Sequence, residues 1–400
     1  MNHKYIYHIF VLHEHMKNMI GIHYPREIIP LIIMTSYNPI KISCGFNHTT
    51  LISDKAYAWG YNGSGRLGFG DDGGSVKFPK EIILHENIKE IICGGYHTMI
   101  LTVFNKIYVC GENNFGQLGL DHNNRINHPQ EMILNGVLPS KKDTISISCG
   151  MNHTIAMIKN KQLYGWGANT FGELGLGHDN DCYLPQEINL CGERDIISVK
   201  CGYYHTVVLV KSKFNRSNKC YAWGMNESGE LGLGYVNLYK NTPQELNLLD
   251  IVTINCGHGY TMALMQNPNK IYVWGRNDFG QLGLGDTTNR NSPTELSLSN
   301  LKFMAISCGM NHVIALTHTG KLFVWGNNKD GQLGLGNQTN YYTPQELIFP
   351  EPIISIFSGG YHNIMISVHN KIFVWGDNNL SQLGLGDKLD RLSPTEIVVC

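Results

Sequence analysis

Residues 274–285 of this 400-residue chain read Trp-Gly-Arg-Asn-Asp-Phe-Gly-Gln-Leu-Gly-Leu-Gly. Close copies of this stretch recur at spacings of 50 to 57 residues, and each begins with the pair Trp-Gly or, once, Cys-Gly. The first residues of the pairs are Trp59, Cys110, Trp166, Trp223, Trp274, Trp325 and Trp375. Self-similarity at this period indicates stacked copies of one supersecondary unit. The repeat therefore decides the architecture, and function has to be sought where the copies differ.

Two further motifs accompany each copy. A Pro-x-Glu segment follows the glycine-rich run, and a β-branched run ending in Cys-Gly-x-x-His comes next, as in Cys308 to His312. Two copies depart from this pattern, because Tyr260 replaces the histidine and Ser358 replaces the cysteine. Each unit contains four short segments rich in Ile, Val, Tyr and Leu that read as strands. In the fifth copy they are residues 243–247, 251–256, 260–265 and 270–274.

Seven copies of four strands predict an all-β fold, a seven-bladed β-propeller of four-stranded blades. We expect it to span residues 25–400, after an N-terminal tail at residues 1–24. A linear solenoid is the alternative. Residues 42–52 and 371–398 each supply part of a unit, so we expect the ring to close by pairing of N- and C-terminal strands in one blade. Pro25–Ile28 is an eighth Pro-x-Glu segment, and either it or Pro394–Ile397 is surplus.

Composition narrows the range of partners. The formal net charge of −1 disfavours binding to nucleic acid, which needs a basic surface. The chain has no apolar run of the roughly 18 residues that span a membrane. Six of the eleven cysteines occupy one repeat position, which indicates packed, reduced thiols and not disulfide pairs. We therefore expect an intracellular protein, cytoplasmic or nuclear, that is a monomer.

The repeated motifs give no sign of catalysis. The glycine-rich run lacks the following helix of a phosphate-binding loop, so tight turns explain it better. One Cys-x-x-x-His pair per blade cannot assemble a tetrahedral zinc site, so we expect a packed cysteine and a histidine bonded to backbone. No nucleophile, base and orienting acid stand out from the repeat. We expect no enzyme activity, no cofactor and no metal.

Together, Trp-Gly-x-Asn-x-x-Gly-x-Leu-Gly-x-Gly, Pro-x-Glu and Cys-Gly-x-x-His-Thr resemble the repeats of the regulator of chromosome condensation family. Seven copies match that family's seven-bladed propeller. The resemblance implies a fold more firmly than a function, because the family includes an exchange factor for the small GTPase Ran, photoreceptors, membrane-traffic and ciliary scaffolds, and docking modules of ubiquitin ligases.

The two variable residues of each Cys-Gly-x-x-His turn are the candidate partner-binding residues. A meander places these turns on the same face as the glycine-rich loops, and the resemblance implies that such turns contact partners. The candidates are Phe46, Asn47, Tyr96, Met151, Asn152, Tyr203, Tyr204, His258, Met310, Asn311 and Tyr361. Aromatic, Met and Asn side chains without charge are typical of a protein-binding surface. The alternative is that they only cap the core.

A second candidate lies on the opposite face. The hairpin between His205 and Trp223 is longer than its counterparts and carries Lys211, Lys213, Phe214, Arg216 and Lys219. It is either a basic finger for an acidic partner or an ordinary exposed hairpin.

The sequence therefore predicts a non-enzymatic scaffold that binds another protein. The alternative is guanine nucleotide exchange on a small GTPase. The Ran exchange factor places acidic residues among the equivalent turns, and the plant ultraviolet-B photoreceptor places tryptophan and arginine there. The turns of this chain contain none of these.

Overall fold

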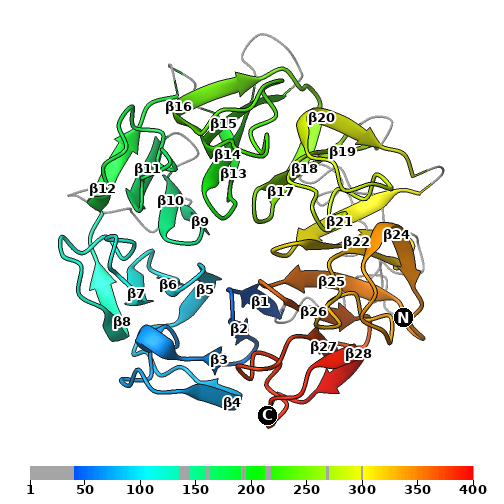
Figure 1. Cartoon of the computed structure of the whole chain (residues 1–400). Coiled ribbons are helices and arrows are strands. Elements are labelled where there is room, and N and C mark those ends of the chain that lie inside the picture. Colours follow the sequence, from blue (N-terminus) through cyan, green and yellow to red (C-terminus); the bar gives the residue numbers. More distant parts are fainter. Residues whose placement is uncertain are drawn as a thin grey trace, which may run out of the picture.

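The computed structural model describes residues 40–134, 145–158, 162–190, 192, 195–211, 218–266, 270–298 and 301–399. Within these residues the chain forms seven four-stranded antiparallel sheets, arranged as blades around a central axis (Figure 1). Each blade is a meander of four consecutive strands. The predicted seven-bladed β-propeller is confirmed. The predicted tail at residues 1–24 lies outside the described residues.

The strands of each blade are numbered from the axis outward. Blade 1 contains β1 (Lys41–Cys44), β2 (His48–Ile52), β3 (Ala56–Tyr61) and β4 (Ser75–Glu81). Blade 2 contains β5 (Ile88–Cys93), β6 (His97–Thr102), β7 (Ile107–Gly111) and β8 (Ile126–Met132). Blade 3 contains β9 (Ile145–Cys149), β10 (His153–Ile158), β11 (Gln162–Gly167) and β12 (Cys182–Ile188). Blade 4 contains β13 (Ile196–Cys201), β14 (His205–Lys211), β15 (Asn218–Met225) and β16 (Tyr239–Leu246).

Blade 5 contains β17 (Ile251–Cys256), β18 (Tyr260–Met265), β19 (Ile271–Gly275) and β20 (Arg290–Leu296). Blade 6 contains β21 (Phe303–Cys308), β22 (His312–Thr317), β23 (Leu322–Gly326) and β24 (Tyr341–Leu347). Blade 7 contains β25 (Ile353–Ser358), β26 (His362–Ser367), β27 (Ile372–Gly376) and β28 (Arg391–Ile397). A short 3-10 turn, η2 (Gly63–Gly65), follows β3. In the part of the chain that the structure describes, no helix is both long and apolar enough to cross a lipid bilayer.

Residue type explains the radial order of the strands. The second strand of a blade is buried along its length, as in β6, because both of its faces pack against other blades. The outermost strand is half exposed, as in β24, and carries the proline of the Pro-x-Glu motif. Proline cannot donate a ladder hydrogen bond, so it is tolerated on an edge strand.

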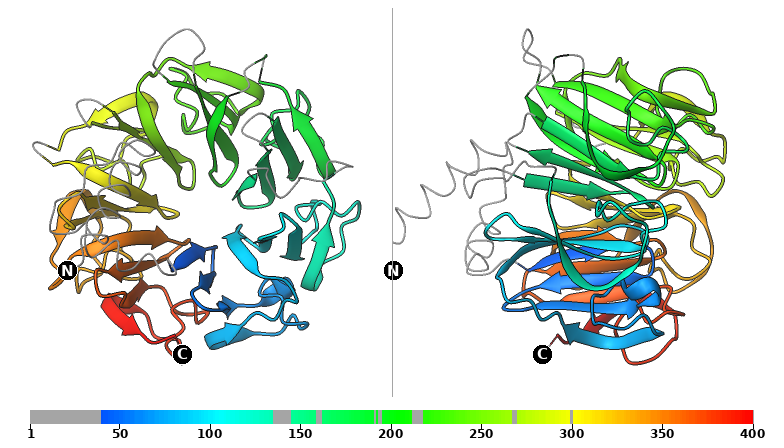
Figure 2. Two further views of the ribbon diagram at one scale, coloured as in Figure 1. Left: turned by 180° about the vertical axis from the view of Figure 1, so that it is seen from behind. Right: turned by 90° about the vertical axis from the view of Figure 1, so that its left-hand side faces the viewer.

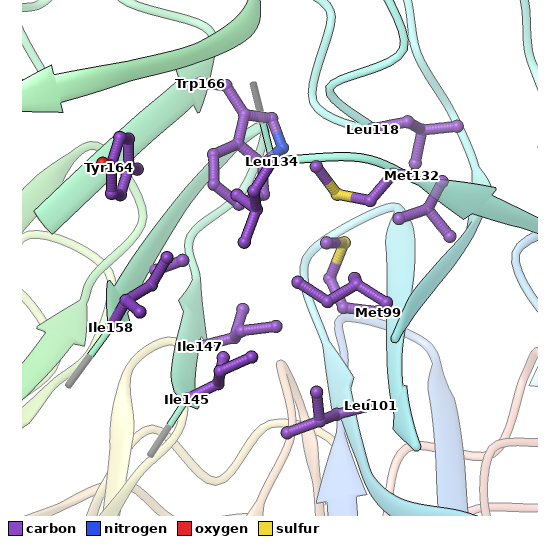
Figure 3. Packing of buried hydrophobic residues seen from close by; sticks show 13 residues of the cluster. Met99, Leu101, Leu118, Met132, Leu134, Ile145, Ile147, Ile158, Tyr164 and Trp166 are labelled. Carbon is purple, nitrogen blue, oxygen red and sulfur yellow. The ribbon is translucent and has the colours of Figure 1, made fainter. Parts of the chain in front are cut away.

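The hydrophobic core lies between neighbouring blades. One cluster joins blades 2 and 3, and Figure 3 shows Met99 and Leu101 of β6 facing Ile145 and Ile147 of β9, with Trp166 packed beside them. Similar clusters fill the other junctions. Each blade therefore depends on its two neighbours for the burial of its apolar side chains.

The ring closes differently from the prediction. No blade mixes N- and C-terminal strands among the described residues, because β1 to β4 and β25 to β28 each form a complete blade. Pro394–Ile397 belongs to β28, the outermost strand of blade 7, and Pro25–Ile28 lies outside the described residues. Closure instead rests on side-chain packing, in a cluster that contains Trp59 of blade 1 and Val374 of blade 7, and on hydrogen bonds between these two blades. Figure 2 shows these two blades side by side from both directions.

The difference arises from the phase of the repeat. A tandem pattern can be divided at any point of its period, and the predicted unit begins at the Pro-x-Glu segment. The structure divides it after that segment, where the chain crosses from the outer edge of one blade to the axis of the next. In the fifth copy, residues 243–247 therefore belong to β16 of blade 4 and not to blade 5.

Candidate functional site

One face of the ring, which we call the turn face, carries the seven Cys-Gly-x-x-His turns and the seven glycine-rich loops. The backbone N–H of Tyr61, at the start of a loop, donates to the carbonyl of Asn47 in the turn, at 2.8 Å. The equivalent bond occurs in every blade, at 2.7 to 3.0 Å. The predicted shared face is therefore confirmed, and each loop holds the turn of its own blade.

The histidine of each turn points into the junction with the next blade. Nε2 of His97 lies 2.9 Å from Oγ1 of Thr154 in the next blade, and the other histidines have equivalent partners. The remaining pairs are His48 with Thr98, His153 with Thr206, His205 with Thr261, His312 with Asn363 and His362 with Thr49, at 2.8 to 3.2 Å. The expectation of a backbone partner for the histidine is wrong, because a side chain of the next blade reaches back to it: a threonine at five junctions and Asn363 at the sixth.

The threonine and the tryptophan of a blade share one acceptor. Oγ1 of Thr154 and Nε1 of Trp166 donate to the carbonyl of Gln117 in the preceding blade, at 3.2 and 3.0 Å. This carbonyl belongs to the variable residue of Gly-x-Leu-Gly. We call the three bonds, from histidine to threonine and from threonine and tryptophan to the carbonyl, the junction staple. Between blades 1 and 2, Sγ of Cys110 takes the tryptophan's place, 3.4 Å from the carbonyl of Arg66.

The staple fixes the tautomer of each histidine that faces a threonine. Because Thr154 spends its only hydroxyl hydrogen on the carbonyl of Gln117, it can only accept from His97, whose Nε2 must carry the proton. Nδ1 of His97 is then unprotonated, and it is buried without a hydrogen-bond partner. Burial is the main cause that lowers the pKa of His97 to about 3, and the positive charge of Arg66 lowers it further. The imidazole is therefore neutral in the folded protein.

The junction between blades 5 and 6 has a different staple. Val313 occupies the threonine position and offers no hydroxyl, and Tyr260 occupies the histidine position. The single hydroxyl hydrogen of Tyr260 is shared between the carbonyl oxygens of Gly309 and His312, which lie 2.9 and 2.8 Å from the hydroxyl oxygen. The tyrosine at position 260 and the valine at position 313 therefore compensate each other.

The tips of the turns surround a cavity of about 120 Å³ on the axis of the ring. The Phe46 ring lies 5.8 Å from that of Tyr96, 5.6 Å from that of Tyr203 and 5.9 Å from that of Tyr361. These residues come from blades 1, 2, 4 and 7, so Phe46 reaches across the ring. Tyr203 also packs edge-on against His258, at 4.1 Å. The structure therefore brings the predicted aromatic residues together into one cluster at the axis.

The eleven predicted residues differ in how far their side chains are exposed to solvent. Nine are half-buried, and Asn152 and Asn311 are buried. Oδ1 of Asn152 accepts a hydrogen bond from Gln117 at 3.1 Å, and Oδ1 of Asn311 accepts one from Gln281 at 3.4 Å. Two of the candidate residues thus stabilise the fold through buried hydrogen bonds, while the aromatic residues at the tips remain partly accessible to solvent.

Sequence reasoning missed the charged residues of the turn face, because it considered only the turns. The Arg66 guanidinium, from a glycine-rich loop, lies 4.9 Å from the ring centres of both Tyr61 and Tyr96. Glu173 and Glu230 occupy the Gly-x-Leu-Gly position in blades 3 and 4, and burial raises the pKa of each carboxyl to about 7. The signal was present in the sequence, since four of the seven copies have glutamine there.

The cysteines that precede the turns line the axial cavity. Burial raises the pKa of Cys93 to about 11 and that of Cys201 to about 12. Buried thiols in this state are poor nucleophiles. Among the described residues, no group of three or more His, Cys, Asp or Glu side chains is arranged to hold a metal ion.

The basic hairpin is only partly described. Lys213, Phe214 and Arg216 lie outside the described residues. Lys211 pairs with Asn218 at the end of the β14–β15 ladder, and Nζ of Lys219 lies 3.3 Å from Glu245. A basic finger at this hairpin stays a prediction.

Comparison with known proteins places the chain among relatives of one fold. The model of a family described as the RCC1-like domain matches residues 22–253 and 215–399. The chain is 30% identical to the ultraviolet-B receptor UVR8 of Arabidopsis thaliana over 322 residues, which cover 79% of this chain and 71% of the receptor. It is 28% identical to the human E3 ubiquitin-protein ligase HERC2 over 316 residues, which cover 76% of this chain and 6% of the ligase.

Solved structures agree on the architecture. The crystal structure of Prp20p from Saccharomyces cerevisiae, described with its binding to Gsp1p and histones, superposes with a TM-score of 0.77 at 22% identity. The match covers 91% of this chain and 87% of Prp20p. Human WBSCR16 gives a TM-score of 0.74 at 22% identity, over 86% of this chain and 93% of that protein. At this identity the likeness extends to the fold alone.

Proposed function

This chain belongs to the RCC1-like domain family, and on that premise we propose that it is a non-enzymatic interaction module that binds another protein through its turn face. The observation that supports the proposal is the aromatic cluster at the axis, where Phe46 contacts rings from three other blades. Aromatic side chains with one packed side and one accessible side are the usual anchors of protein interfaces. They hold their positions before binding, which lowers the entropy lost on association.

The experiment removes these anchors without disturbing the blades. The triple variant Tyr96→Glu, Tyr204→Glu, Tyr361→Glu places three charges at half-buried tips of the turn face. Proteins captured by proximity labelling in the native cell are compared with those of the parent chain, after circular dichroism has shown that the variant is folded. We expect the specific partners to disappear from the capture.

The matched control carries three charges elsewhere. Ile83, Ile133 and Ile348 follow outermost strands at the opposite face and are 83%, 62% and 87% exposed. Their substitution by Glu should leave the captured partners unchanged. If the tyrosine variant retains every partner that the isoleucine variant retains, the turn face is not the binding surface.

Guanine nucleotide exchange on a small GTPase is the second candidate, and the fold shared with Prp20p, whose description names Gsp1p, favours it. An exchange factor acts by binding, so the absence of a catalytic triad does not count against this candidate. Release of labelled GDP is measured on a panel of Ran-like and Rab-like GTPases. Acceleration at micromolar protein would support exchange, and its absence across the panel would eliminate it.

A further inference from the structure

The glycine-rich loop of blade 4, residues 226–238, exposes more apolar side chains than its counterparts. Tyr235, Val236 and Leu238 are 44%, 57% and 52% exposed. The other six loops together contain two exposed large apolar side chains, Phe115 and Leu389. Single exposed apolar residues are ordinary, whereas several in one segment indicate an interaction site.

The fold of the loop does not require these side chains. In blades 5, 6 and 7 the residue after the last glycine is Asp or Asn, and its Oδ1 accepts a hydrogen bond from Nδ2 of the loop asparagine at 2.9 to 3.1 Å. In blade 4 this residue is Tyr235, and Oδ1 of Asn237 takes over the acceptor role, 2.7 Å from Nδ2 of Asn226. The loop therefore keeps its closing bond while the Tyr235 side chain is released to the surface.

Hydrogen bonds connect the exposed part of this loop to the tip of its own turn. The backbone N–H of Met225 donates to the carbonyl of Tyr204 at 2.9 Å. The N–H of the next residue, Asn226, donates to the carbonyl of Leu238 at 3.0 Å, and its Nδ2 donates to the carbonyl of Tyr235 at 3.0 Å. The apolar side chains of the tip and of the loop therefore belong to one connected surface.

This surface runs along a single blade. In Figure 1 blade 4 extends from β13 beside the axis to β16 at the rim, so the tip lies at the inner end and the loop leads to the outer end. We call this row of side chains the blade 4 stripe: Tyr203, Tyr204, Met225, Tyr235, Val236 and Leu238.

The other repeats show that the stripe is a property of blade 4. Blade 4 alone has aromatic residues at both variable positions of its turn. At the position of Met225, blades 2, 5 and 7 have the charged residues Glu112, Arg276 and Asp377. At the position of Tyr235, blades 5 and 7 have Asp286 and Asp387. In the sequence, no other repeat is apolar at the turn, at the start of the loop and at its end.

The backbone of the stripe favours a helix over an extended peptide. The carbonyls of Tyr204, Tyr235 and Leu238 each accept an internal hydrogen bond, so pairing with an added strand is disfavoured. A helix satisfies its own backbone groups and can present apolar side chains along one face.

The charges beside the stripe give its margin a net negative charge. Glu227 is exposed and directly follows Asn226. On the side of blade 3, Oδ2 of Asp179 accepts a hydrogen bond from the hydroxyl of Tyr239 at 3.1 Å. Nζ of Lys240 lies 5.4 Å from the centre of the Tyr235 ring. Two carboxylates against this one ammonium favour a partner with basic residues beside its apolar face.

We infer that the blade 4 stripe binds an amphipathic helix of the partner protein, with the apolar face on the stripe and basic residues toward Glu227 and Asp179. The inference rests on the proposed function and deepens it, because it specifies which part of the turn face the partner covers and with what kind of segment.

The test uses a defined amphipathic peptide as a probe of the full chain. The protein is labelled with ¹³C at the Leu and Val methyl groups, and the signals of Val236 and Leu238 are identified by their loss in Val236→Thr and Leu238→Gln. The probe is an acetylated and amidated peptide in which the heptad Leu-Lys-Lys-Leu-Leu-Lys-Leu occurs twice. We expect saturable shifts of both signals. A peptide of the same composition with leucines on every helix face should bind about tenfold more weakly.

Two double variants separate the stripe from general attraction. Val236→Thr with Leu238→Gln removes exposed apolar side chains without adding charge, so it should weaken binding about tenfold and leave the circular dichroism spectrum unchanged. Ile348→Thr with Leu389→Gln makes matching changes at exposed side chains of blades 6 and 7 and should bind as the parent chain does. Glu227→Gln should weaken binding about threefold at low salt, and less at high salt.

Three peptide results would overturn the inference: no saturable shift, equal binding of the rearranged peptide, or equal binding by the two double variants. A fourth is a response of the Val236 and Leu238 signals to vesicles of phosphatidylcholine and phosphatidylserine without a response to the peptide. That result would assign the loop to a lipid surface.

Failure of this inference is distinguishable from failure of the proposed function. If the peptide does not bind while the tyrosine variant still loses its partners, the stripe is not a helix site and the proposed function stands. If the peptide binds while the tyrosine variant keeps every partner, the proposed function is wrong and the stripe remains a helix site without that role.

Discussion

Two junctions of the ring reverse what their positions suggest. The junction between blades 7 and 1 joins strands from opposite ends of the described chain, yet it carries the ordinary staple, with His362 bonded to Thr49 and both Thr49 and Trp59 bonded to the carbonyl of Gln382. The junction between blades 5 and 6 lies within continuous chain, yet it has the altered pair of Tyr260 and Val313.

The chemistry of a junction therefore follows from its local side chains and not from the connectivity of the chain. A valine at the threonine position removes the acceptor that a histidine needs. Tyrosine is longer and reaches past the valine to backbone carbonyls. The closing junction keeps its threonine, so it needs no special device.

Lowering the pH should have the largest effect on stability, because six junctions contain a buried neutral histidine, whereas the junction between blades 5 and 6 contains Tyr260 in its place. The six staple histidines have pKa values held low by burial, to about 3 for His153, His205 and His362, whereas the unfolded chain binds protons near pH 6.5. Stability is therefore complete above pH 6.5 and falls as pH decreases, by about 1.4 kcal/mol per histidine per pH unit. At pH 5 each histidine whose folded-state pKa is about 3 lowers the stability by about 2 kcal/mol. We expect urea midpoints, followed by circular dichroism, to fall steeply from pH 7.5 to 5. Equal midpoints would contradict the neutral staple.

Exchange of residues at the unusual junction should have the next largest effect. Tyr260→His places an imidazole opposite Val313, leaving its N–H unsatisfied, and should cost about 2 to 4 kcal/mol of unfolding free energy. Val313→Thr alone should cost less than about 1 kcal/mol, because its hydroxyl can donate to the Gln281 carbonyl. The double variant should recover at least about 1 kcal/mol relative to the sum of the single changes. Strict additivity in urea unfolding would show that the two positions are independent.

Removal of a hydroxyl from the closing junction tests whether it is ordinary. Thr49→Val leaves His362 without its acceptor and should lower the free energy of unfolding by about 1 to 3 kcal/mol. Thr206→Val makes the same change between blades 3 and 4 and serves as the matched control. We expect the two variants to melt within a few degrees of each other. A much larger loss for Thr49→Val would mean that the ring has a specialised seam.

The smallest effect is expected in a glycine-rich loop, at the buried side chain of Glu230. Burial raises the pKa of Glu230 to about 7, above the value of the unfolded chain, so ionisation penalises the folded state as pH rises from about 4.5 to 7. Glu230→Gln should therefore stabilise the protein by about 1 kcal/mol at pH 8, and the gain should vanish near pH 4.5. This is the opposite pH trend to that of the histidines. A destabilised variant at pH 8 would show that the carboxylate supports the fold.

The repeat made most of the fold predictable. The Trp-Gly ladder indicated seven units, and the alternation of short apolar segments indicated four strands in each. The blade boundary was not predictable, because a cyclic pattern has no preferred starting point and the packing that selects one, between residues such as Trp59 and Val374, is distant in sequence.

The site was predictable only in part. Turn residues such as Phe46 and Tyr203 were found because they vary within a constant frame. The buried carboxyl groups of Glu173 and Glu230 were missed because they lie in the glycine-rich loops and not in the turns. The partnership of Tyr260 and Val313 was missed because it needs two departures from the repeat in different blades, and only Tyr260 drew attention.

The indole groups of the staples give the ring a set of built-in optical reporters. Trp59, Trp166, Trp223, Trp274, Trp325 and Trp375 are each fully buried at a different junction, and each indole N–H is bonded to the neighbouring blade. The junction between blades 1 and 2 has Cys110 in place of the tryptophan and therefore gives no indole fluorescence. Fluorescence of single-tryptophan versions would thus show whether the disc opens at one boundary first or loses all of them at once.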